Sequence, residues 1–224
     1  MQNLRRLAAV GLAGTAFLGV SALGERRASA SFIDAGIEAG VVKRSLADTS
    51  YKPGFVWQLH AELALIPPIL MLGPYATFSN ATPDVSTKDS PSSVAFRTFG
   101  LRAKLKLPLP GDFKPYGVAG VGYVHADFPD QVLTYCADPN IPAACVSRPV
   151  TSATANFAEF ILGGGFLYEF ASPLALTVEF NWRPSVGYKN DVYQKQLQNQ
   201  STTAPDPGRN GSAWTLMGGL SLVL

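Results

Sequence analysis

Apolar and charged side chains alternate along the stretch "FGLRAKLKL", Phe99 to Leu107. Apolar or small residues occupy the odd positions, whereas Arg102, Lys104 and Lys106 occupy even positions. Successive side chains of a β-strand point to opposite faces, so a strand here would have one apolar face and one cationic face. The pattern therefore predicts a strand that separates an apolar environment from a polar one.

Extended segments of this kind recur along the chain, and none of them shows helical periodicity. We expect strands over residues 32–43, 54–66, 69–79, 94–107, 114–127, 154–170, 174–187 and 212–224. Each segment has at least the ~9–11 residues with which a tilted strand crosses a bilayer. The chain is therefore predicted to be all-β.

The connections between these segments are alternately short and long. Short connections rich in Pro and Gly occur at 67–68, 108–113 and 171–173, and long polar stretches occur at 44–53, 81–93, 128–153 and 188–211. Outer-membrane barrels have short turns on the periplasmic side and long loops outside the cell. The spacing thus predicts an eight-stranded antiparallel up-and-down transmembrane β-barrel with four long extracellular loops.

Alternation alone does not say which face lines the interior, because a soluble barrel would enclose the leucines and expose the charges. Bulky apolar side chains fill one face of whole strands, which is more than an eight-stranded interior can hold. Small residues such as Gly36 and Gly100 lie on the polar face. Aromatic residues such as Trp57 and Trp182 lie near strand ends, as in the interfacial girdles of membrane barrels. These features favour a membrane barrel with its charges inside.

The residues expected in the lumen are ionisable and carry both signs of charge. They are Asp34, Glu38, His60, Glu62, Arg102, Lys104, Lys106, Glu159, Glu169, Glu179 and Arg183. Unpaired charges away from water are costly, so these side chains should pair with one another or stay hydrated. Eight strands leave room for side chains and not for an open channel, so we expect the network to plug the lumen.

The first thirty residues have the layout of a secretory signal peptide. A basic start, "MQNLRR", precedes an uncharged run, and "ASA" at Ala28 to Ala30 forms a small-residue cleavage motif before Ser31. The alternative is a retained transmembrane anchor, for which the apolar run is long enough. We expect a signal peptide at 1–30 and a barrel at 31–224. Only 15% of the residues are charged, against ~25% in soluble domains, and the net charge of +2 suggests no nucleic-acid partner.

Two longer motifs resemble a known family. "KPYGVAGVGYVHADF", Lys114 to Phe128, resembles the fifth strand of the outer-membrane β-barrel superfamily that includes OmpA-like, opacity-type and OmpW-like small barrels. "LALTVEFNWRP", Leu174 to Pro184, resembles its seventh strand. The resemblance implies a Gram-negative outer membrane, with its lipids and lipopolysaccharide, and folding by the barrel assembly machinery. The chain departs from the family in ending with Leu224 in place of an aromatic residue.

Candidate chemistry outside the lumen is sparse. Cys136 and Cys145 are the only cysteines, and the oxidising compartment that a signal peptide implies predicts a disulfide between them. His60 and His125 each precede an acidic residue by two positions, which permits a weak metal site, but we assign none. No cofactor motif is present, because "ILGGGFLY" lacks the helix and Lys-Ser/Thr of a phosphate loop.

The functional prediction is a monomeric barrel with a structural or surface-interaction role, whose loops could bind an extracellular ligand. A small passive channel for small or hydrophobic solutes is the first alternative. A lipid-modifying enzyme is the second, and it would need a serine such as Ser152 or Ser185 next to a histidine. No motif supports such an arrangement, so we expect no enzymatic activity.

Overall fold

A computed structural model of the chain describes residues 32–46, 49–84, 91–136, 145–150, 152–188 and 211–224. The segment predicted to be a signal peptide lies outside these residues. Eight long strands dominate the described part: β1 (Ile33–Leu46), β3 (Gly54–Ile66), β4 (Leu70–Ala81), β5 (Val94–Lys106), β6 (Phe113–Phe128), β9 (Ala153–Ala171), β10 (Leu174–Val186) and β11 (Gly211–Val223). No helix long and apolar enough to cross a membrane occurs in this part of the chain.

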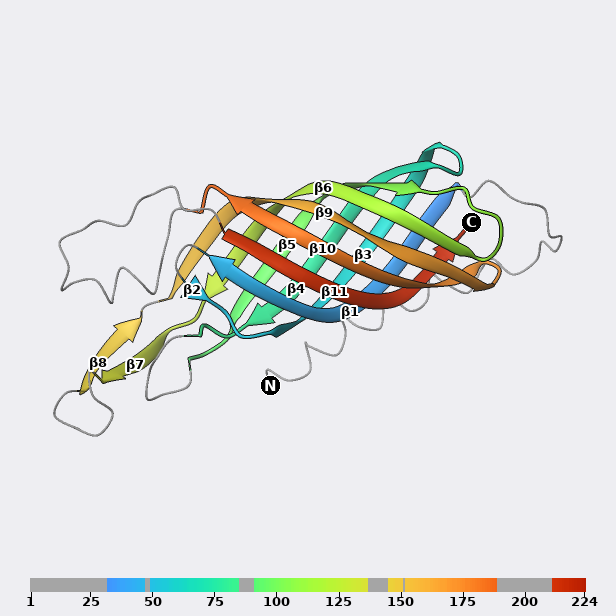
Figure 1. Ribbon diagram of the computed structural model, residues 1–224. Helices are drawn as coiled ribbons and strands as arrows, with labels where there is room; N and C mark the ends of the chain where they lie inside the picture. The colour runs from blue at the N-terminus through green and yellow to red at the C-terminus, as the bar shows by residue number, and fades with distance from the viewer. Residues whose placement is uncertain (1–31, 47–48, 85–90, 137–144, 151, 189–210) are drawn as a thin grey trace, which may run out of the picture.

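The eight long strands form one closed antiparallel barrel (Figure 1). Their order around the barrel is β11-β10-β9-β6-β5-β4-β3-β1, and β1 then pairs with β11 from Asp34↔Val223 to Ser45↔Ser212. Closure satisfies the backbone hydrogen bonds between strands and leaves no free sheet edge. The predicted fold class is confirmed, and the strand ends lie within three residues of the predicted ones.

Three short strands lie outside the barrel wall. β2 (Thr49–Ser50) pairs with the end of β1, and β7 (Gln131–Cys136) pairs with β8 (Cys145–Val150) as a separate two-stranded sheet. Figure 1 shows this hairpin projecting beyond the barrel at the end opposite the C-terminus. The sequence analysis treated 128–153 as a loop and so missed the hairpin, because its six-residue strands are too short to cross a bilayer.

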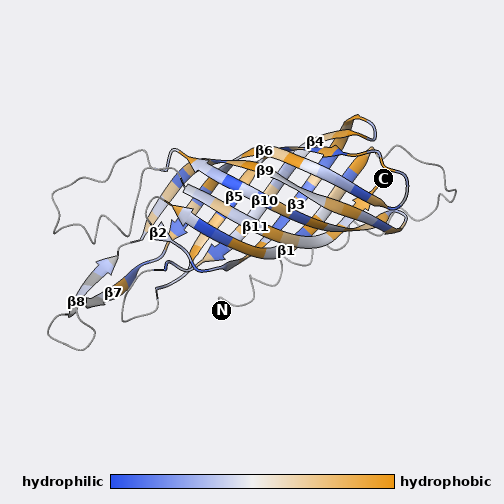
Figure 2. Cartoon of the chain, viewed as in Figure 1, coloured by the Kyte–Doolittle hydropathy of each residue, from blue (hydrophilic) through white to orange (hydrophobic). Residues whose placement is uncertain are grey.

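The barrel is apolar outside and polar inside. Leu101, Leu176 and Leu216 are 55%, 47% and 57% exposed, whereas Arg102 and Glu179 are both 0% exposed. Orange apolar positions alternate with blue polar ones along the strands in Figure 2, as side chains of opposite faces must. A soluble barrel would show the reverse arrangement, so the inverted arrangement predicted from the sequence is confirmed.

Aromatic side chains mark the limits of the apolar outer wall. Phe160 and Phe170 both point outward from β9, ten residues apart in sequence. At about 3.3 Å per residue and a tilt of about 40°, ten residues rise about 25 Å, the height of the apolar band of outer-membrane barrels. Trp182 and Trp214 stack on the outer wall of neighbouring strands β10 and β11 with ring centroids 6.0 Å apart. The wall therefore has the dimensions of a membrane-spanning surface.

Candidate functional site

Ionisable side chains fill the middle of the bore, because every second residue of each strand points inward. Ten of the eleven side chains that the sequence predicted for the lumen are at most 5% exposed: Asp34, Glu38, His60, Glu62, Arg102, Lys104, Lys106, Glu159, Glu179 and Arg183. They come from β1, β3, β5, β9 and β10. Burial to this degree requires partners for each charge.

Arg102 connects three strands at the centre of the network. Its Nε donates to Glu62 Oε1 at 2.5 Å, and its Nη1 donates to Glu179 Oε1 at 3.1 Å. Glu179 also accepts hydrogen bonds from the Tyr116 hydroxyl at 3.1 Å and from Asn181 Nδ2 at 2.8 Å. The planar fork of an arginine suits such simultaneous contacts with two carboxylates.

Two lysines on β5 hold the carboxylates at the end of the bore with the short turns. Lys104 Nζ lies 3.0 Å from both Asp34 Oδ2 and Glu62 Oε2. Lys106 Nζ lies 2.9 Å from the same Asp34 oxygen. The alternation "RAKLK" that opened the sequence analysis thus delivers three consecutive inward cations to acidic partners on β1, β3 and β10.

A second group of pairs lies toward the loop end and contains one residue that the sequence analysis missed. Glu159 accepts from Arg183 at 3.4 Å and from Arg44 at 2.8 Å. The predicted first strand ended at residue 43, whereas β1 continues to Leu46 and carries Arg44 into the bore. The inward alternation of Val42, Arg44 and Leu46 is the signal that could have found it.

Gln58 joins the two groups into one network. Its Nε2 donates to Glu38 Oε2 at 3.1 Å, while its Oε1 accepts from Arg183 Nη2 at 2.7 Å and from Thr77 at 3.0 Å. A neutral amide can donate on one side and accept on the other, so it links an acidic to a basic group without adding charge.

The buried charges are equal in number. Five carboxylates (Asp34, Glu38, Glu62, Glu159 and Glu179) face five cations (Arg44, Arg102, Lys104, Lys106 and Arg183), all at most 4% exposed. Removing one partner of a buried pair typically costs 3–5 kcal/mol, because the other charge is left uncompensated. The described part of the bore thus holds as many carboxyl groups as lysine and arginine side chains.

The loop end of the bore is apolar, which the sequence analysis did not predict. An apolar cluster there consists of Leu46, Tyr51, Ala81, Val94, Phe96, Val124, Ala126, Phe128, Ala155, Phe157 and Tyr188. Several members are terminal residues of their strands, such as Leu46 of β1, Val94 of β5 and Phe128 of β6. The Arg44 guanidinium lies 4.6 Å from the Phe96 ring centroid and connects this cluster to the charge network. The apolar cluster and the charge network follow one another along the bore.

Glu169 departs from the predicted set. It pairs with Lys114 at 2.6 Å, and the two side chains are 28% and 32% exposed. Glu169 lies two residues before the end of β9, so it reaches the rim with the short turns and not the central network. Glu169 is thus separated in depth from the central network, because strand parity gives the direction of a side chain but not its depth.

The remaining candidates lie apart from the bore. His125 lies at the loop end of β6, where Nε2 is 3.0 Å from Asp127 Oδ1 and Nδ1 is 2.7 Å from Asn156 Oδ1. Cys136 and Cys145 are backbone partners in the β7–β8 pairing. Directly opposed residues have the Cα separation that a disulfide requires. The disulfide itself stays a prediction.

The closed antiparallel barrel with an apolar wall and a charged bore has the fold of the small Gram-negative outer-membrane β-barrels. Neisserial surface protein A resembles the chain with a TM-score of 0.54 at 11% identity, over 86% of this chain and 97% of that chain. OprG from Pseudomonas aeruginosa gives a TM-score of 0.48 at 11% identity, over 88% and 96%. Ail of Yersinia pestis gives 0.40 at 12% identity, over 86% and 99%.

No family model and no curated protein sequence matches the chain. At these identities the likeness defines the fold and not the activity. The outer-membrane barrel class predicted from the sequence is thus confirmed as a fold. An outer-membrane location is consistent with this fold and with the apolar outer wall.

Proposed function

We propose that the chain is a closed, non-conducting barrel that anchors extracellular loops in the outer membrane for a structural or surface-interaction role. The observation that supports this proposal is the filled bore. A balanced charge network occupies its middle, and an apolar cluster of eleven buried residues occupies its loop end. Ions would have to displace paired charges and then pass the apolar cluster, and both steps are costly.

The rest of the proposal follows from the orientation of the barrel. The end with the β7–β8 hairpin faces the exterior, where an extracellular ligand could bind, and the end with the short turns faces the periplasm. The apolar wall contacts the acyl chains of the bilayer and of lipopolysaccharide. The barrel assembly machinery inserts the chain, and the closed sheet with no unpaired barrel strand suits a monomer.

Planar-bilayer recording tests the proposal. We expect no stepwise conductance from the purified, folded barrel under conditions in which an open porin inserted into the same bilayers gives steps. Mobility on a gel with and without boiling shows that the tested protein is folded, since membrane barrels stay compact in detergent until heated. A reproducible unitary conductance from the folded form would reject the closed barrel in favour of a small passive channel.

An enzymatic role lacks support at Ser185, which is 0% exposed inside the bore. The backbone amide of Ser152 donates to Asp130. In the described part of the chain, the side-chain partners of His125 are Asp127 and Asn156, and neither is a serine. We therefore propose that the barrel is not an enzyme. Release of acyl chains from labelled lipid A, abolished by His125→Ala, would overturn this part of the proposal.

A further inference from the structure

The His60 imidazole is buried in the bore beside carboxylates. The residue is 5% exposed, and neither ring nitrogen has a hydrogen-bond partner among the described residues. Nε2 lies 3.5 Å from Asp34 Oδ1, and Nδ1 lies 3.9 Å from Glu38 Oε1. Buried polar atoms are rarely left without a partner, so the two ring nitrogens of His60 are candidates for binding a ligand.

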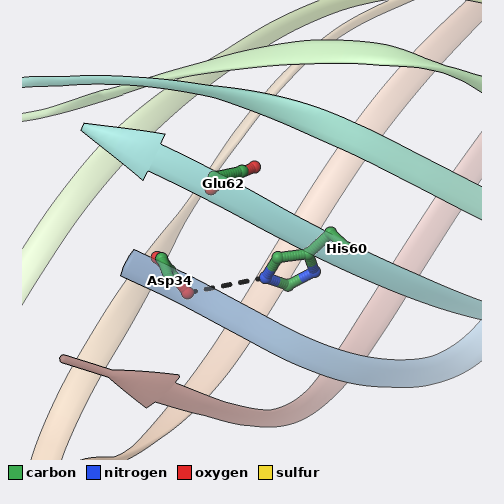
Figure 3. A group of neighbouring side chains, drawn as sticks. All are labelled: Asp34, His60 and Glu62. Atoms are coloured by element: carbon green, nitrogen blue, oxygen red, sulfur yellow. Dashed lines mark ion pairs between the residues drawn. The ribbon is translucent and has the colours of Figure 1, made fainter. Parts of the chain in front are cut away.

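Two carboxylates present oxygen atoms to the same place. Asp34 Oδ1 is a buried atom without a hydrogen-bond partner in the described part of the chain, and Glu62 Oε2 lies 3.0 Å from Lys104 Nζ. One ligand atom from each of Asp34, His60 and Glu62 lies within 4.8 Å of the others. Figure 3 shows the three side chains on neighbouring strands, with Asp34 and His60 facing each other.

The β1–β3 pairing fixes this arrangement. Asp34 is the direct partner of Glu62, and Gly36 is the direct partner of His60. A Cβ at position 36 would lie 2.7 Å from His60 Cε1, so the glycine makes room for the ring. The three candidate ligands thus come from two paired strands and not from loops, which favours a defined geometry.

We propose that Asp34, His60 and Glu62 bind one divalent cation of the zinc class in the bore. Zn²⁺ takes imidazole nitrogen at about 2.0–2.1 Å and carboxylate oxygen at about 2.0–2.2 Å, whereas Mg²⁺ and Ca²⁺ prefer oxygen ligands alone. Ligand atoms of a tetrahedral site are then about 3.3–3.6 Å apart. The Asp34–His60 separation of 3.5 Å matches this spacing, and the ligand atom of Glu62 lies within 4.8 Å of the other two.

Lys104 competes with the cation for both carboxylates, alongside Lys106 at Asp34 and Arg102 at Glu62. The Lys104 Nζ lies 3.0 Å from both Asp34 Oδ2 and Glu62 Oε2, so an ammonium already compensates the two carboxylates. Because the buried charges are otherwise balanced, a dication adds two positive charges to the bore. The Lys104 ammonium and the metal therefore compete for the same two carboxylates. Removal of the lysine should tighten metal binding, which an ordinary structural role of these residues would not produce.

The test is zinc titration of the full-length folded barrel in detergent, with bound zinc measured by mass spectrometry after equilibrium dialysis. We expect one zinc per chain, at least a ten-fold loss of affinity in His60→Gln, and unchanged affinity in the matched control His125→Gln. Lys104→Met should bind at least ten-fold more tightly than the natural chain. Gel mobility before and after boiling confirms that each variant is folded.

A second measurement serves if Lys104→Met fails to fold. Zinc should raise the temperature at which the natural barrel unfolds, since a ligand of the folded state stabilises it, and His60→Gln should remove that increase. Equal zinc binding by the natural chain and His60→Gln, or no zinc retained by the natural chain, would overturn the proposal. Neither result would bear on the conductance test of the closed barrel.

Discussion

The Tyr75 side chain of β4 fills the space that a side chain at Gly122 of β6 would need. Both residues point into the bore, and a Cβ at position 122 would overlap the Tyr75 hydroxyl. Gly100, on the strand between them, is the direct partner of both residues, and a Cβ there would lie 2.7 Å from Tyr75 Cε1. Glycines on two adjacent strands thus form a recess for one aromatic ring.

Gly122→Ala should therefore destabilise the barrel by about 1–3 kcal/mol, the usual cost of overpacking. Tyr75→Phe removes the overlapping hydroxyl, so Gly122→Ala should cost less in that background. Urea unfolding of the purified barrel in detergent measures both effects. Gly117→Ala is the matched control, because nothing lies nearer than 3.9 Å to its added Cβ, and an equal loss there would contradict the explanation.

Arg102→Met should destabilise the barrel by about 3–5 kcal/mol, since Glu62 and Glu179 would each lose a buried cationic partner. Arg97→Met is the control: Arg97 also pairs with an acid, Asp127 at 3.0 Å, but its side chain is 51% exposed. Exposed pairs contribute at most about 1 kcal/mol. Each variant is heated, and the temperature at which it loses its compact mobility on a gel is compared. Similar temperatures for the two variants would contradict the burial of the Arg102 ion pairs.

Leu176→Arg should destabilise the membrane-inserted barrel by about 2–4 kcal/mol, the cost of a cation on the lipid face near the bilayer centre. Leu176 points outward from β10, six residues before Trp182 at one limit of the apolar wall. Val132→Arg is the control, because Val132 is 60% exposed on the projecting hairpin. Refolding into lipid vesicles, followed by gel mobility, measures the difference, and equal yields of the two variants would count against the bilayer-facing wall.

The predicted disulfide gives a fourth expectation. Mass spectrometry of the exported protein after thiol labelling should find Cys136 and Cys145 unlabelled without reductant and both labelled with it. Closing so small a ring contributes about 2–3 kcal/mol in the chain-entropy model, and the contribution should be confined to the hairpin. Cys136→Ser should thus leave the unfolding temperature of the barrel unchanged. Labelling of either cysteine without reductant would contradict the pairing.

The barrel could be predicted from the sequence because strand alternation has a period of two and the charges mark one face. Lys104 and Lys106 reach the bore as the pattern "RAKLK" requires. Depth along the bore has no comparable signal, so Glu169 was assigned to the network although it lies at the rim. Arg44 was missed for a related reason, because polar residues after Val42 resemble the start of a loop.

The apolar cluster was beyond the reach of the sequence for a different reason. Phe96, Phe128 and Phe157 share their face with charged residues of the same strands, so alternation alone groups them with the polar side. Only the barrel geometry brings them together at one end. The contact of Gln58 with Arg183 likewise depends on two strands that are distant in sequence, since the two residues are 125 positions apart.

The charge network also constrains the order of assembly. Arg102 and Glu179 are 77 positions apart, and Arg44 and Glu159 are 115 positions apart. A β5–β6 hairpin entering the bilayer alone would carry Arg102, Lys104 and Lys106 without the acids that neutralise them, which come from β1, β3 and β10. The inserted chain becomes electrically neutral only when its first and last thirds meet. Water must therefore accompany the cations until β1 pairs with β11 and closes the barrel.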